Sequence, residues 1–390
     1  MRFARLIEKV PPFLEFAKEH VTMQRALSAY FRSRREMGAR DRRLFRSVVF
    51  ANLRMGRCLS TEPEKFRTQC GIYLVGELDW NLVKEDVDSE VLKSIHQDFS
   101  LGNRLANLKA EFPMFDESEL FPYESLVSDA IDFQEFRRSM LVPPRVHIRI
   151  RRDSYQQVIQ ELESLRIPHE INTLPCSLSF NQGIDLESTL SFIQGSFEVQ
   201  DLASQSVVAE YDPQPGETWW DVCAASGGKT LGLLDKCEGI SLLSSDIRST
   251  IIENLKARLK KTGLKNVDVR LIDAAVEVDI PGAPFDAMIV DVPCSGSGTW
   301  ARTPEQLSIF DESRLPDHFA PLQKSIIKGA IRQLKPEGRL FYSTCSVFQS
   351  ENEDIVNWMV NTLGLRVVSM NYFSRYFDRA DTLFSAVLTR

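Results

Sequence analysis

The chain of 390 residues is 43% hydrophobic and 26% charged, and it carries a formal net charge of −7. This composition is that of a globular protein, and the length predicts two or three domains. No apolar run approaches the roughly 18 residues needed to span a bilayer. Charged residues interrupt the N-terminal apolar positions, so we expect neither a membrane span nor a secretory signal. The seven cysteines and five histidines are dispersed without a C-x-x-C pair, which favours a cytoplasmic protein without disulfides or a metal site.

Residues 1–135 are predicted to form an all-α domain. The segments "FLEFAKEHVTMQRALSAYFRSRREMG" and "ARDRRLFRSVVFANLRMGRCL" carry apolar residues at three-to-four spacing, the period of an amphipathic helix. Breaks at Pro11-Pro12, Gly38 and Pro63 separate the helical segments. No alternating strand pattern occurs in this part of the sequence.

Arginines are concentrated in two clusters, although the chain as a whole is acidic. The first cluster is opposed only by Glu36 and Asp41, and the second contains no acidic residue. For either cluster alone, solvated helix faces and ion pairs with an acidic stretch at about residues 77–135 explain the arginines as well as a phosphate-rich partner does. The two together favour a phosphate-rich partner, because phosphate contacts need local cations. The first cluster is Arg25, Arg32, Arg34, Arg35, Arg40, Arg42, Arg43, Arg46, Arg54 and Arg57, and the second is Arg137, Arg138, Arg145, Arg149, Arg151 and Arg152.

Residues 136–205 are predicted to form a small α+β module. In "VPPRVHIRIRR", apolar and basic side chains alternate, which predicts a half-buried strand whose outer face is basic. A helical segment follows at "SYQQVIQELESLRI", and two further strand-like segments lie around "EINTLPCSLSF" and "GSFEVQ". A sheet with arginines on its open face suits single-stranded RNA, so we interpret this module as RNA-binding.

Residues 206–390 are predicted to form an α/β domain with a doubly wound, mostly parallel sheet. Five apolar segments alternate with helical ones, and each looks buried on both faces, as parallel strands are. The last two strand segments have no helix between them, which predicts an antiparallel hairpin at the sheet edge and seven strands in all. The predicted strands are "TWWDVC", "GISLLSSD", "VDVRLID", "FDAMIVDV", "GRLFYSTC", "LRVVSM" and "TLFSAVLTR", and the predicted helices are 229–236, 248–262, 318–335 and 351–363.

The turn after the first of these strands, "CAASGGKT", ends like a phosphate-binding loop. That loop needs a glycine five residues before Gly228, and Cys223 stands there instead. The G-x-G-x-x-G spacing of a dinucleotide-binding turn is also absent. Small residues at a helix N-terminus still let a ligand reach backbone N–H groups, so we expect this turn to bind another ligand with a charged end.

Aspartates end the next three strands. Asp246, Asp273 and Asp291 lie where ligands bind in open α/β sheets. Each of them alone is more simply explained as a turn or helix-cap residue. Together with the glycine turn they predict a ligand with a ribose, a nucleobase and a charged end, with Asp246 on the ribose and Asp273 near the base. S-adenosyl-L-methionine meets this description.

Cys294 and Cys345 follow the fourth and fifth strands, so they are predicted to lie at neighbouring strand ends beside the methyl donor. Most cysteines are small buried hydrophobic residues, but both of these lie in turns rich in Ser, Gly and Thr. Pro293 fixes the backbone before Cys294. Gly296 and Gly298 allow a planar group to approach the chain closely.

Two thiols beside a methyl sulfonium suit transfer to C5 of a pyrimidine. A thiolate that adds to C6 makes C5 nucleophilic enough to attack the methyl group. A second acid/base group then assists loss of the C5 proton and release of the thiol. Spacing alone does not rank one cysteine above the other as the nucleophile.

The motifs "DVCAASGGKT", "DVPCSGSGT" and "YSTCS" resemble those of the RsmB/Nop/Sun family of RNA cytosine-C5 methyltransferases, and "VQDLASQ", "DPQPGE" and "LKPEGRL" resemble its connecting segments. The resemblance extends over about residues 140–390 and implies a Rossmann-like class I methyltransferase domain. It implies that Cys345 is the nucleophile and that Cys294 assists product release. It also implies that Asp291 and Lys229 lie at the reacting cytosine. The donor-binding set expected from the resemblance and the strand ends is Cys223, Ala224, Ala225, Ser226, Gly227, Gly228, Lys229, Asp246, Arg248, Asp273 and Asp291.

Two further segments resemble parts of the same family. Residues 143–200 are similar to its RNA-binding extension, and "ARDRRLFRSVVFANLRMGR" resembles the NusB-type domain of its bacterial small-subunit (16S) rRNA members. The resemblance therefore implies small-subunit rRNA as the partner, with tRNA as the alternative. Nothing in the sequence indicates an obligate interface, so we expect a monomer.

The sequence departs from the family pattern at Ser226, where a proline is usual. We expect Ser226 to cap the following helix, so that donor binding survives. One rival function is methylation of an exocyclic amine, which normally places Asn/Asp-Pro-Pro-aromatic after the fourth strand, where this chain has "DVPC". The other is a non-catalytic RNA-binding assembly factor, and the presence of Cys345, Cys294 and Asp291 counts against it.

Overall fold

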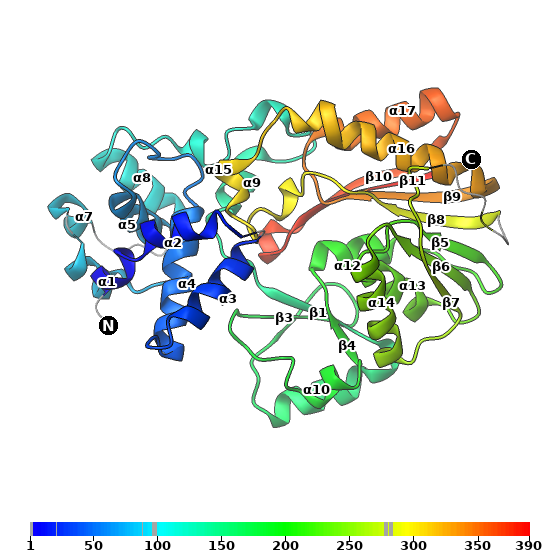
Figure 1. Ribbon diagram of the computed structural model, residues 1–390, viewed down its shortest axis with the longest axis horizontal. Helices are drawn as coiled ribbons and strands as arrows, with labels where there is room; N and C mark the ends of the chain where they lie inside the picture. The colour runs from blue at the N-terminus through cyan, green and yellow to red at the C-terminus, as the bar shows by residue number, and fades with distance from the viewer. Residues whose placement is uncertain (1–2, 21, 88, 96–99, 277–279, 281–283) are drawn as a thin grey trace. The chain divides into compact units, whose positions relative to one another are not determined.

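The computed structural model describes residues 3–20, 22–87, 89–95, 100–276, 280 and 284–390. The chain divides into two compact units (Figure 1). Unit 1 comprises Met1–Ser125, Asp132–Pro143 and Trp300–Asp311. Unit 2 comprises Leu126–Ile131, Pro144–Thr299 and Glu312–Arg390.

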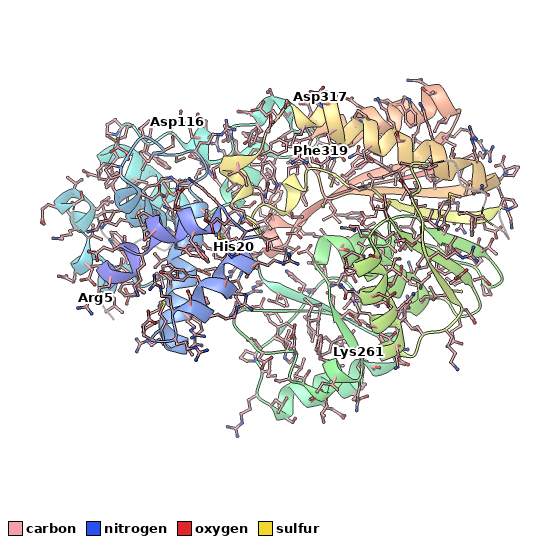
Figure 2. The ribbon with its side chains drawn as sticks, in the orientation of Figure 1. Arg5, His20, Asp116, Lys261, Asp317 and Phe319 are labelled. Atoms are coloured by element: carbon pink, nitrogen blue, oxygen red, sulfur yellow. The ribbon has the colours of Figure 1, made fainter. Side chains whose placement is uncertain are left out.

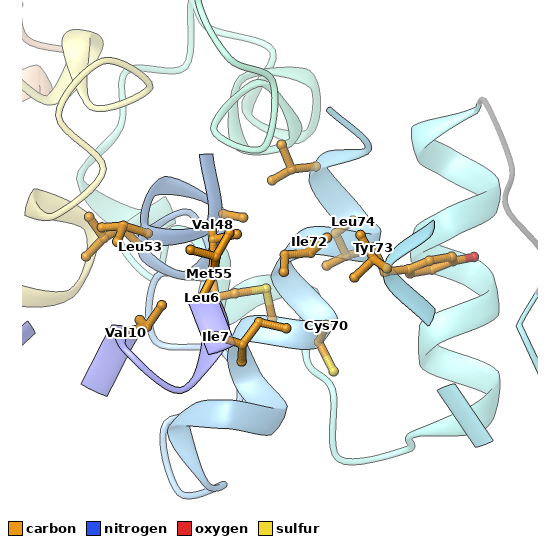
Figure 3. Close-up of a cluster of buried hydrophobic side chains, with 14 of the residues drawn as sticks. Leu6, Ile7, Val10, Val48, Leu53, Met55, Cys70, Ile72, Tyr73 and Leu74 are labelled. Atoms are coloured by element: carbon orange, nitrogen blue, oxygen red, sulfur yellow. The ribbon is translucent and has the colours of Figure 1, made fainter. Parts of the chain in front are cut away.

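Unit 1 contains only helices and turns among its described residues, which confirms the predicted helical N-terminal region. Its apolar residues form one buried cluster, in which Leu6, Ile7 and Val10 lie beside Val48 and Met55 (Figure 3). Burial of each such side chain contributes about 1.5–3 kcal/mol through the hydrophobic effect. The helices are α1 (Phe3–Ile7), α2 (Val10–Ala17), α3 (Met23–Ser33), α4 (Ala39–Leu53), α5 (Glu64–Val75), α6 (Trp80–Val83), α7 (Glu90–Ser94), α8 (Leu101–Glu111), α9 (Phe133–Ser139) and α15 (Gln306–Ile309).

A segment that is distant in sequence completes unit 1. The rings of Trp300 and Phe310 pack edge-on against the ring of Tyr123, with centroid distances of 5.6 and 5.4 Å. The buried Arg54 side chain donates a hydrogen bond to the carbonyl oxygen of Ala301 (2.7 Å). Aromatic pairs and charge-assisted hydrogen bonds of this kind stabilise a fold beyond simple burial, so residues 300–311 are a structural part of the helical unit.

The main sheet of unit 2 has seven strands in the order β10-β11-β9-β8-β5-β6-β7. Strands β5 to β9 pair in parallel, whereas β11 pairs antiparallel with both β9 and β10. The predicted Rossmann-like fold with an antiparallel edge hairpin is therefore confirmed. The strands are β5 (Thr218–Asp221), β6 (Ser241–Asp246), β7 (Val267–Leu271), β8 (Phe285–Asp291), β9 (Leu334–Thr344), β10 (Arg366–Ser374) and β11 (Thr382–Thr389).

Helices cover both faces of this sheet, because successive side chains of a strand point to opposite sides. Trp219 and Ile289 pack in one buried cluster with α12, α13 and α14, and Trp220 and Val290 pack in another with α16 and α17. The two helix layers are visible in Figure 1. The helices are α12 (Leu202–Ala209), α13 (Gly228–Lys236), α14 (Ser249–Thr262), α16 (Ala320–Ala330) and α17 (Glu353–Leu363).

Strand β7 differs from its prediction. It lies at the sheet edge and pairs only with β6, and its residues are half-buried or exposed. The prediction that this strand is buried on both faces is therefore wrong. An edge strand has a neighbour on one side only, and the apolar pattern of "VDVRLID" does not report this position.

The module that precedes the main sheet has its own antiparallel sheet of order β2-β3-β1-β4. Ile148 and Ile150 of its central strand pack against Val158, Leu178 and Phe197 in a separate core. The predicted strand–helix–strand pattern is confirmed. The elements are β1 (Val146–Ile150), α10 (Tyr155–Ser164), β2 (Glu170–Ile171), β3 (Ser177–Phe180), α11 (Leu190–Ile193) and β4 (Phe197–Val199).

The predicted open basic face of this module is wrong, because that face packs against helices of the main sheet. Arg149 is 8% exposed and donates hydrogen bonds to Asp235 of α13 and to Gln200, both at 2.9 Å. Arg151 donates to the carbonyl oxygen of Thr262 at the end of α14 (2.7 Å). Alternation predicted which side chains share a face of β1, but it could not predict what covers that face.

A cation–π contact also joins the module to α14. The ammonium group of Lys261, which Figure 2 labels, lies 3.4 Å from the ring centroid of Phe192 in α11. A cation over an aromatic face adds about 0.5–2 kcal/mol, depending on its exposure. The module is therefore joined to α13 and α14 by ionic, hydrogen-bonded and cation–π contacts.

The two arginine clusters differ in the structure. Five members of the second cluster form ion pairs within the chain, with Glu117, Glu135, Glu170, Asp153 or Asp235 as partners. Seven members of the first cluster are exposed, and no ion pair joins any of them to another described residue. The seven are Arg25, Arg32, Arg34, Arg35, Arg40, Arg43 and Arg46 on and around α3 and α4.

Candidate active site

The glycine turn between β5 and α13 is shaped by its backbone. Ala225 and Gly227 both have a positive φ, of +46° and +87°. The amide of Ala224 donates to the carbonyl oxygen of Ser245 (2.8 Å), and the amide of Ala225 donates to the Asp246 carboxylate (3.1 Å). The turn is thus tied to the end of β6, and the N-terminus of α13 lies directly behind it.

Ser226 does not act as the predicted helix cap. The N-cap of α13 is Gly227, and no side chain caps this helix. The Ser226 carbonyl oxygen instead accepts a hydrogen bond from Arg258 of α14 (2.5 Å), and Arg258 also pairs with Glu198 of β4. The turn is therefore braced from outside by an arginine, which spacing along the sequence could not reveal.

Of the strand-end aspartates, Asp246 lies beside this turn. The Asp246 carboxylate accepts hydrogen bonds from the amide of Ala225 and from the backbone and guanidinium of Arg248. Burial alone would raise the pKa of Asp246, but these hydrogen bonds outweigh burial and lower this pKa. Asp273 accepts a bond from the amide of Ala275 in its own turn (3.0 Å). Burial raises the pKa of the Cys223 thiol, which starts the turn.

Lys229 and Asp291 form an ion pair that joins the glycine turn to the end of β8. The Lys229 Nζ lies 2.7 Å from one Asp291 oxygen, and the other oxygen accepts a hydrogen bond from Ser343 (2.8 Å). Burial alone would lower the pKa of Lys229, but the attraction of Asp291 outweighs burial and raises this pKa. A buried ammonium held in this way stays charged and supplies a fixed positive charge next to the thiols.

Cys294 and Cys345 are in contact, with their Sγ atoms 3.4 Å apart. The hydrogen bond with Cys345 and burial together raise the pKa of Cys294. The amide of Gly298 donates to the Cys345 carbonyl oxygen (2.9 Å), and a Cβ on Gly298 would lie 2.0 Å from the carbonyl oxygen of Thr382. Gly298 therefore serves close packing of the chain on itself.

Two buried carboxylates next to the site were not singled out from the sequence. Glu351 accepts hydrogen bonds from both cysteine-bearing turns. Asp221, the last residue of β5, accepts a bond from Thr230 (2.6 Å), and burial raises its pKa to about 7. The position of Asp221 directly before the glycine turn was a usable signal, whereas Glu351 gave none.

The structure thus brings Cys294, Cys345, Lys229 and Asp291 into one cluster, with the glycine turn and Asp246 at the adjoining strand ends. Among the described residues, no group of three or more His, Cys, Asp or Glu side chains is arranged to hold a metal ion. No helix in the described part of the chain has the length and apolar character needed to cross a membrane.

The Rossmann-like fold of the chain is shared with solved structures of low sequence identity. The crystal structure of PH0851 aligns over 99% of both chains with a TM-score of 0.73 at 21% identity. NSun6 from Pyrococcus horikoshii with SFG aligns over 70% of this chain and 96% of its own, with a TM-score of 0.60 at 18% identity. At these identities the likeness shows the fold.

The sequence comparison relates part of the chain to known methyltransferases. Residues 208–375 match the family model described as 16S rRNA methyltransferase RsmB/F. Ribosomal RNA small subunit methyltransferase B of Yersinia enterocolitica is 31% identical over 209 residues, which are 52% of this chain and 46% of that protein. The mouse tRNA (cytosine(72)-C(5))-methyltransferase NSUN6 is 36% identical over 180 residues, 42% of this chain and 36% of that protein. The chain therefore matches about half or less of these relatives' lengths.

Proposed function

We propose that the chain is an RNA (cytosine-C5)-methyltransferase that transfers the methyl group of S-adenosyl-L-methionine to C5 of a cytosine. The observation that carries the proposal is the pair of thiols in contact at the ends of β8 and β9, with the Lys229–Asp291 ion pair beside it. Methylation of an exocyclic amine needs neither thiol. A scaffold protein would need none of the four side chains.

The residues at the other strand ends fit the methyl donor. The glycine turn offers backbone N–H groups at a helix N-terminus, where the charged amino-acid end of the donor can bind. Asp246 would take the ribose hydroxyls once the Arg248 side chain, which is 58% exposed, leaves the carboxylate. Asp273 would lie near the adenine. S-adenosyl-L-methionine supplies a methyl group on a sulfonium, which a carbon nucleophile can take.

The four clustered side chains have distinct roles in the proposal. The Cys345 thiolate would form a bond to C6 of the cytosine, and the electron pair would move to C5. C5 would then take the methyl group, while the bond to the donor sulfur breaks and its electron pair stays with S-adenosyl-L-homocysteine, which leaves. A base removes the C5 proton, the C6–S bond breaks, and Cys345 leaves as the thiolate. Cys294 acts as the acid/base group in this release. Asp291 would hydrogen-bond the cytosine ring, and Lys229 would stabilise negative charge at the reacting base.

We further propose RNA as the partner of unit 1, with small-subunit rRNA as the substrate. The seven exposed arginines without ion pairs among the described residues supply the cations that phosphate contacts need. The family description and the relatives named for small-subunit rRNA support rRNA, whereas the identity with the mouse enzyme supports tRNA as the second candidate. A cytoplasmic monomer, with a NusB-like region at 1–135 and an RNA-binding module at 136–205, remains our prediction from the sequence.

Methyl transfer in vitro tests this function. Purified protein and labelled S-adenosyl-L-methionine are offered separately to unmodified small-subunit rRNA and to bulk tRNA, and the nucleosides are then identified. Label in 5-methylcytidine from rRNA is the expected result. Label from tRNA alone would keep the chemistry and contradict the proposed substrate. A protein that binds the donor and labels neither RNA would contradict the proposal that these are its substrates.

A further inference from the structure

Glu351 is a buried carboxylate that joins the two cysteine-bearing turns. It ends the short 3-10 helix η8 (Gln349–Glu351) after β9, and its side chain is 0% exposed. A buried carboxylate is costly unless several donors satisfy it. In this structure the donors come from segments that are more than fifty residues apart in the sequence.

The partners of Glu351 are the residues that directly follow the two cysteines. Ser295, after Cys294, donates from its amide to Oε1 (2.9 Å) and from its hydroxyl to Oε2 (2.5 Å). Ser346, after Cys345, donates from its hydroxyl to the same Oε2 (2.6 Å). One carboxylate oxygen therefore holds both turns at once, and the two thiols are held in the same arrangement.

Two further side chains fix the carboxylate itself. Gln323 of α16 donates from one amide nitrogen both to Oε1 of Glu351 and to the carbonyl oxygen of Pro293, each at 3.1 Å. The Tyr342 hydroxyl donates to the backbone carbonyl oxygen of Glu351 (2.6 Å). Because all of these partners are buried or half-buried, Glu351 has little freedom to move away from the turns.

Glu351 lies close enough to Cys294 for its charge to act on the thiol. The other titratable groups near Cys294 are Cys345 and Tyr342. A nearby anion disfavours a thiolate, so the carboxylate that holds the two turns also opposes ionisation of Cys294.

We propose that Glu351 is a positioning residue that holds the two cysteine-bearing turns together and, through its negative charge, opposes ionisation of Cys294. The inference rests on the proposed function for the roles of the thiols. The effect of Glu351 on Cys294 is a property of the protein without RNA, and the alkylation of Cys294 is measured without RNA.

The test compares Glu351→Gln with Glu351→Ala. In Glu351→Gln the amide oxygen can accept the bonds of Oε1 from Ser295 and Gln323, and the amide nitrogen can donate to the two serine hydroxyls, so the contacts survive and the charge is lost. Glu351→Ala loses both. The readout is the rate of Cys294 alkylation by iodoacetamide against pH, measured in a Cys345→Ser background with the modified cysteine identified by peptide mass.

The expected result for Glu351→Gln is a Cys294 alkylation profile displaced by about one unit to lower pH, which is about tenfold faster alkylation below its midpoint. With Cys345 intact, the same variant should lose about tenfold in kcat and keep its RNA KM. The matched control is Glu353→Gln, because Glu353 bonds Ser128 and Tyr372 and neither cysteine-bearing turn. The control should leave the Cys294 profile unchanged.

An unchanged profile in Glu351→Gln, or an equal displacement in Glu353→Gln, would overturn the inference. If Glu351→Gln does not fold, Ser346→Ala replaces it, since this change removes one bond to Oε2 and keeps the charge. That variant should transfer methyl groups more slowly while its Cys294 alkylation profile stays in place, and a displaced profile would contradict the charge effect. If Glu351→Gln displaces the profile but the protein with Glu351 intact methylates no RNA, this inference stands and the proposed function fails.

Discussion

The carboxyl end of the main sheet is built in two different ways. After β5 and β6, the glycine turn takes its shape from the backbone, with positive φ at Ala225 and Gly227 and amide bonds to the end of β6. After β8 and β9, the thiols are placed by side chains, and hydrogen bonds from Ser295 and Ser346 converge on Glu351. The first half is expected to bind the methyl donor and the second to carry the chemistry.

This difference predicts where substitutions act. A site made of backbone atoms tolerates changes of exposed side chains and fails when a residue cannot adopt the required φ. A site made of side-chain atoms fails when a single functional group is removed. Substitutions in the first half should therefore change donor affinity, and those in the second half should change the rate.

Cys345→Ala should have the largest effect. Without the thiolate that adds to C6, methyl transfer should fall by at least about 10³-fold, as when a catalytic nucleophile is deleted. The variant should also form no covalent adduct with RNA containing 5-fluorocytosine, detected as a shifted band on a denaturing gel. Cys237→Ala is the control, because that thiol contacts the Glu238 carbonyl oxygen outside the cluster. An adduct in Cys345→Ala would contradict the assignment of the nucleophile.

Cys294→Ala should act at a later step of the same reaction. Loss of the acid/base group should slow product release by about 10²–10⁴-fold, so the protein should accumulate as an adduct on ordinary cytosine RNA. Denaturing gels of protein incubated with donor and RNA measure this accumulation. Normal turnover without accumulated adduct would contradict the role given to Cys294. It would also show that the site after β8 and β9 depends less on single side chains than we expect.

Gly227→Ala tests the donor half. Gly227 has a φ of +87°, and a Cβ there would lie 2.3 Å from Cδ1 of Leu255. The strain of about 1–2 kcal/mol should weaken donor binding by about tenfold, as measured by calorimetry. Ser226→Ala is the matched control and should bind the donor within about twofold of wild type, because the exposed Ser226 side chain does not cap α13. Equal losses of donor affinity in both variants would contradict the view that backbone conformation, and not side chains, shapes the glycine turn.

Asp221→Asn should change the stability of the fold, and not methyl transfer directly, in a way that depends on pH. Burial raises the pKa of Asp221 to about 7, so between about pH 4 and pH 7 the folded protein holds a proton that the unfolded chain has lost. The contribution of Asp221 to the free energy of unfolding is fully present below about pH 4. It falls as the pH rises toward about 7, by up to about 1.4 kcal/mol per pH unit. Urea unfolding at about pH 5 and about pH 7 should show this slope in wild type and lose it in Asp221→Asn. An unchanged slope would contradict the assignment to Asp221.

Much of the fold was predictable because the residues that are buried in a strand or helix recur at regular spacing in the sequence. Strands β5, β6, β8 and β9 carry apolar residues on both faces, and the helices between them carry an apolar stripe, so their positions and the edge hairpin followed from the pattern. The pattern does not say what lies next to a strand. For that reason the exposure of β7 and the covered basic face of β1 were both predicted wrongly.

The candidate site was predictable where one residue type in one motif carries the chemistry. Cys294, Cys345 and Asp291 lie at strand ends, and sheet topology alone brings such ends together. Glu351 and Arg258 gave no signal, because a charged residue at or in a helix normally faces solvent. Their partners come from distant turns, so only the folded chain shows that each supports a particular backbone segment.

Trp300–Asp311 follows the Cys294 turn by a few residues and belongs to unit 1. A single cut in the chain therefore cannot separate the two units into intact pieces. A fragment that begins after residue 143 would keep the segment matched to the family model and would leave Trp300 and Phe310 without the ring of Tyr123. Recombinant pieces for binding experiments would need a redesigned linker in place of residues 300–311, and gene fusions that exchange the helical unit would have to transplant this segment as well.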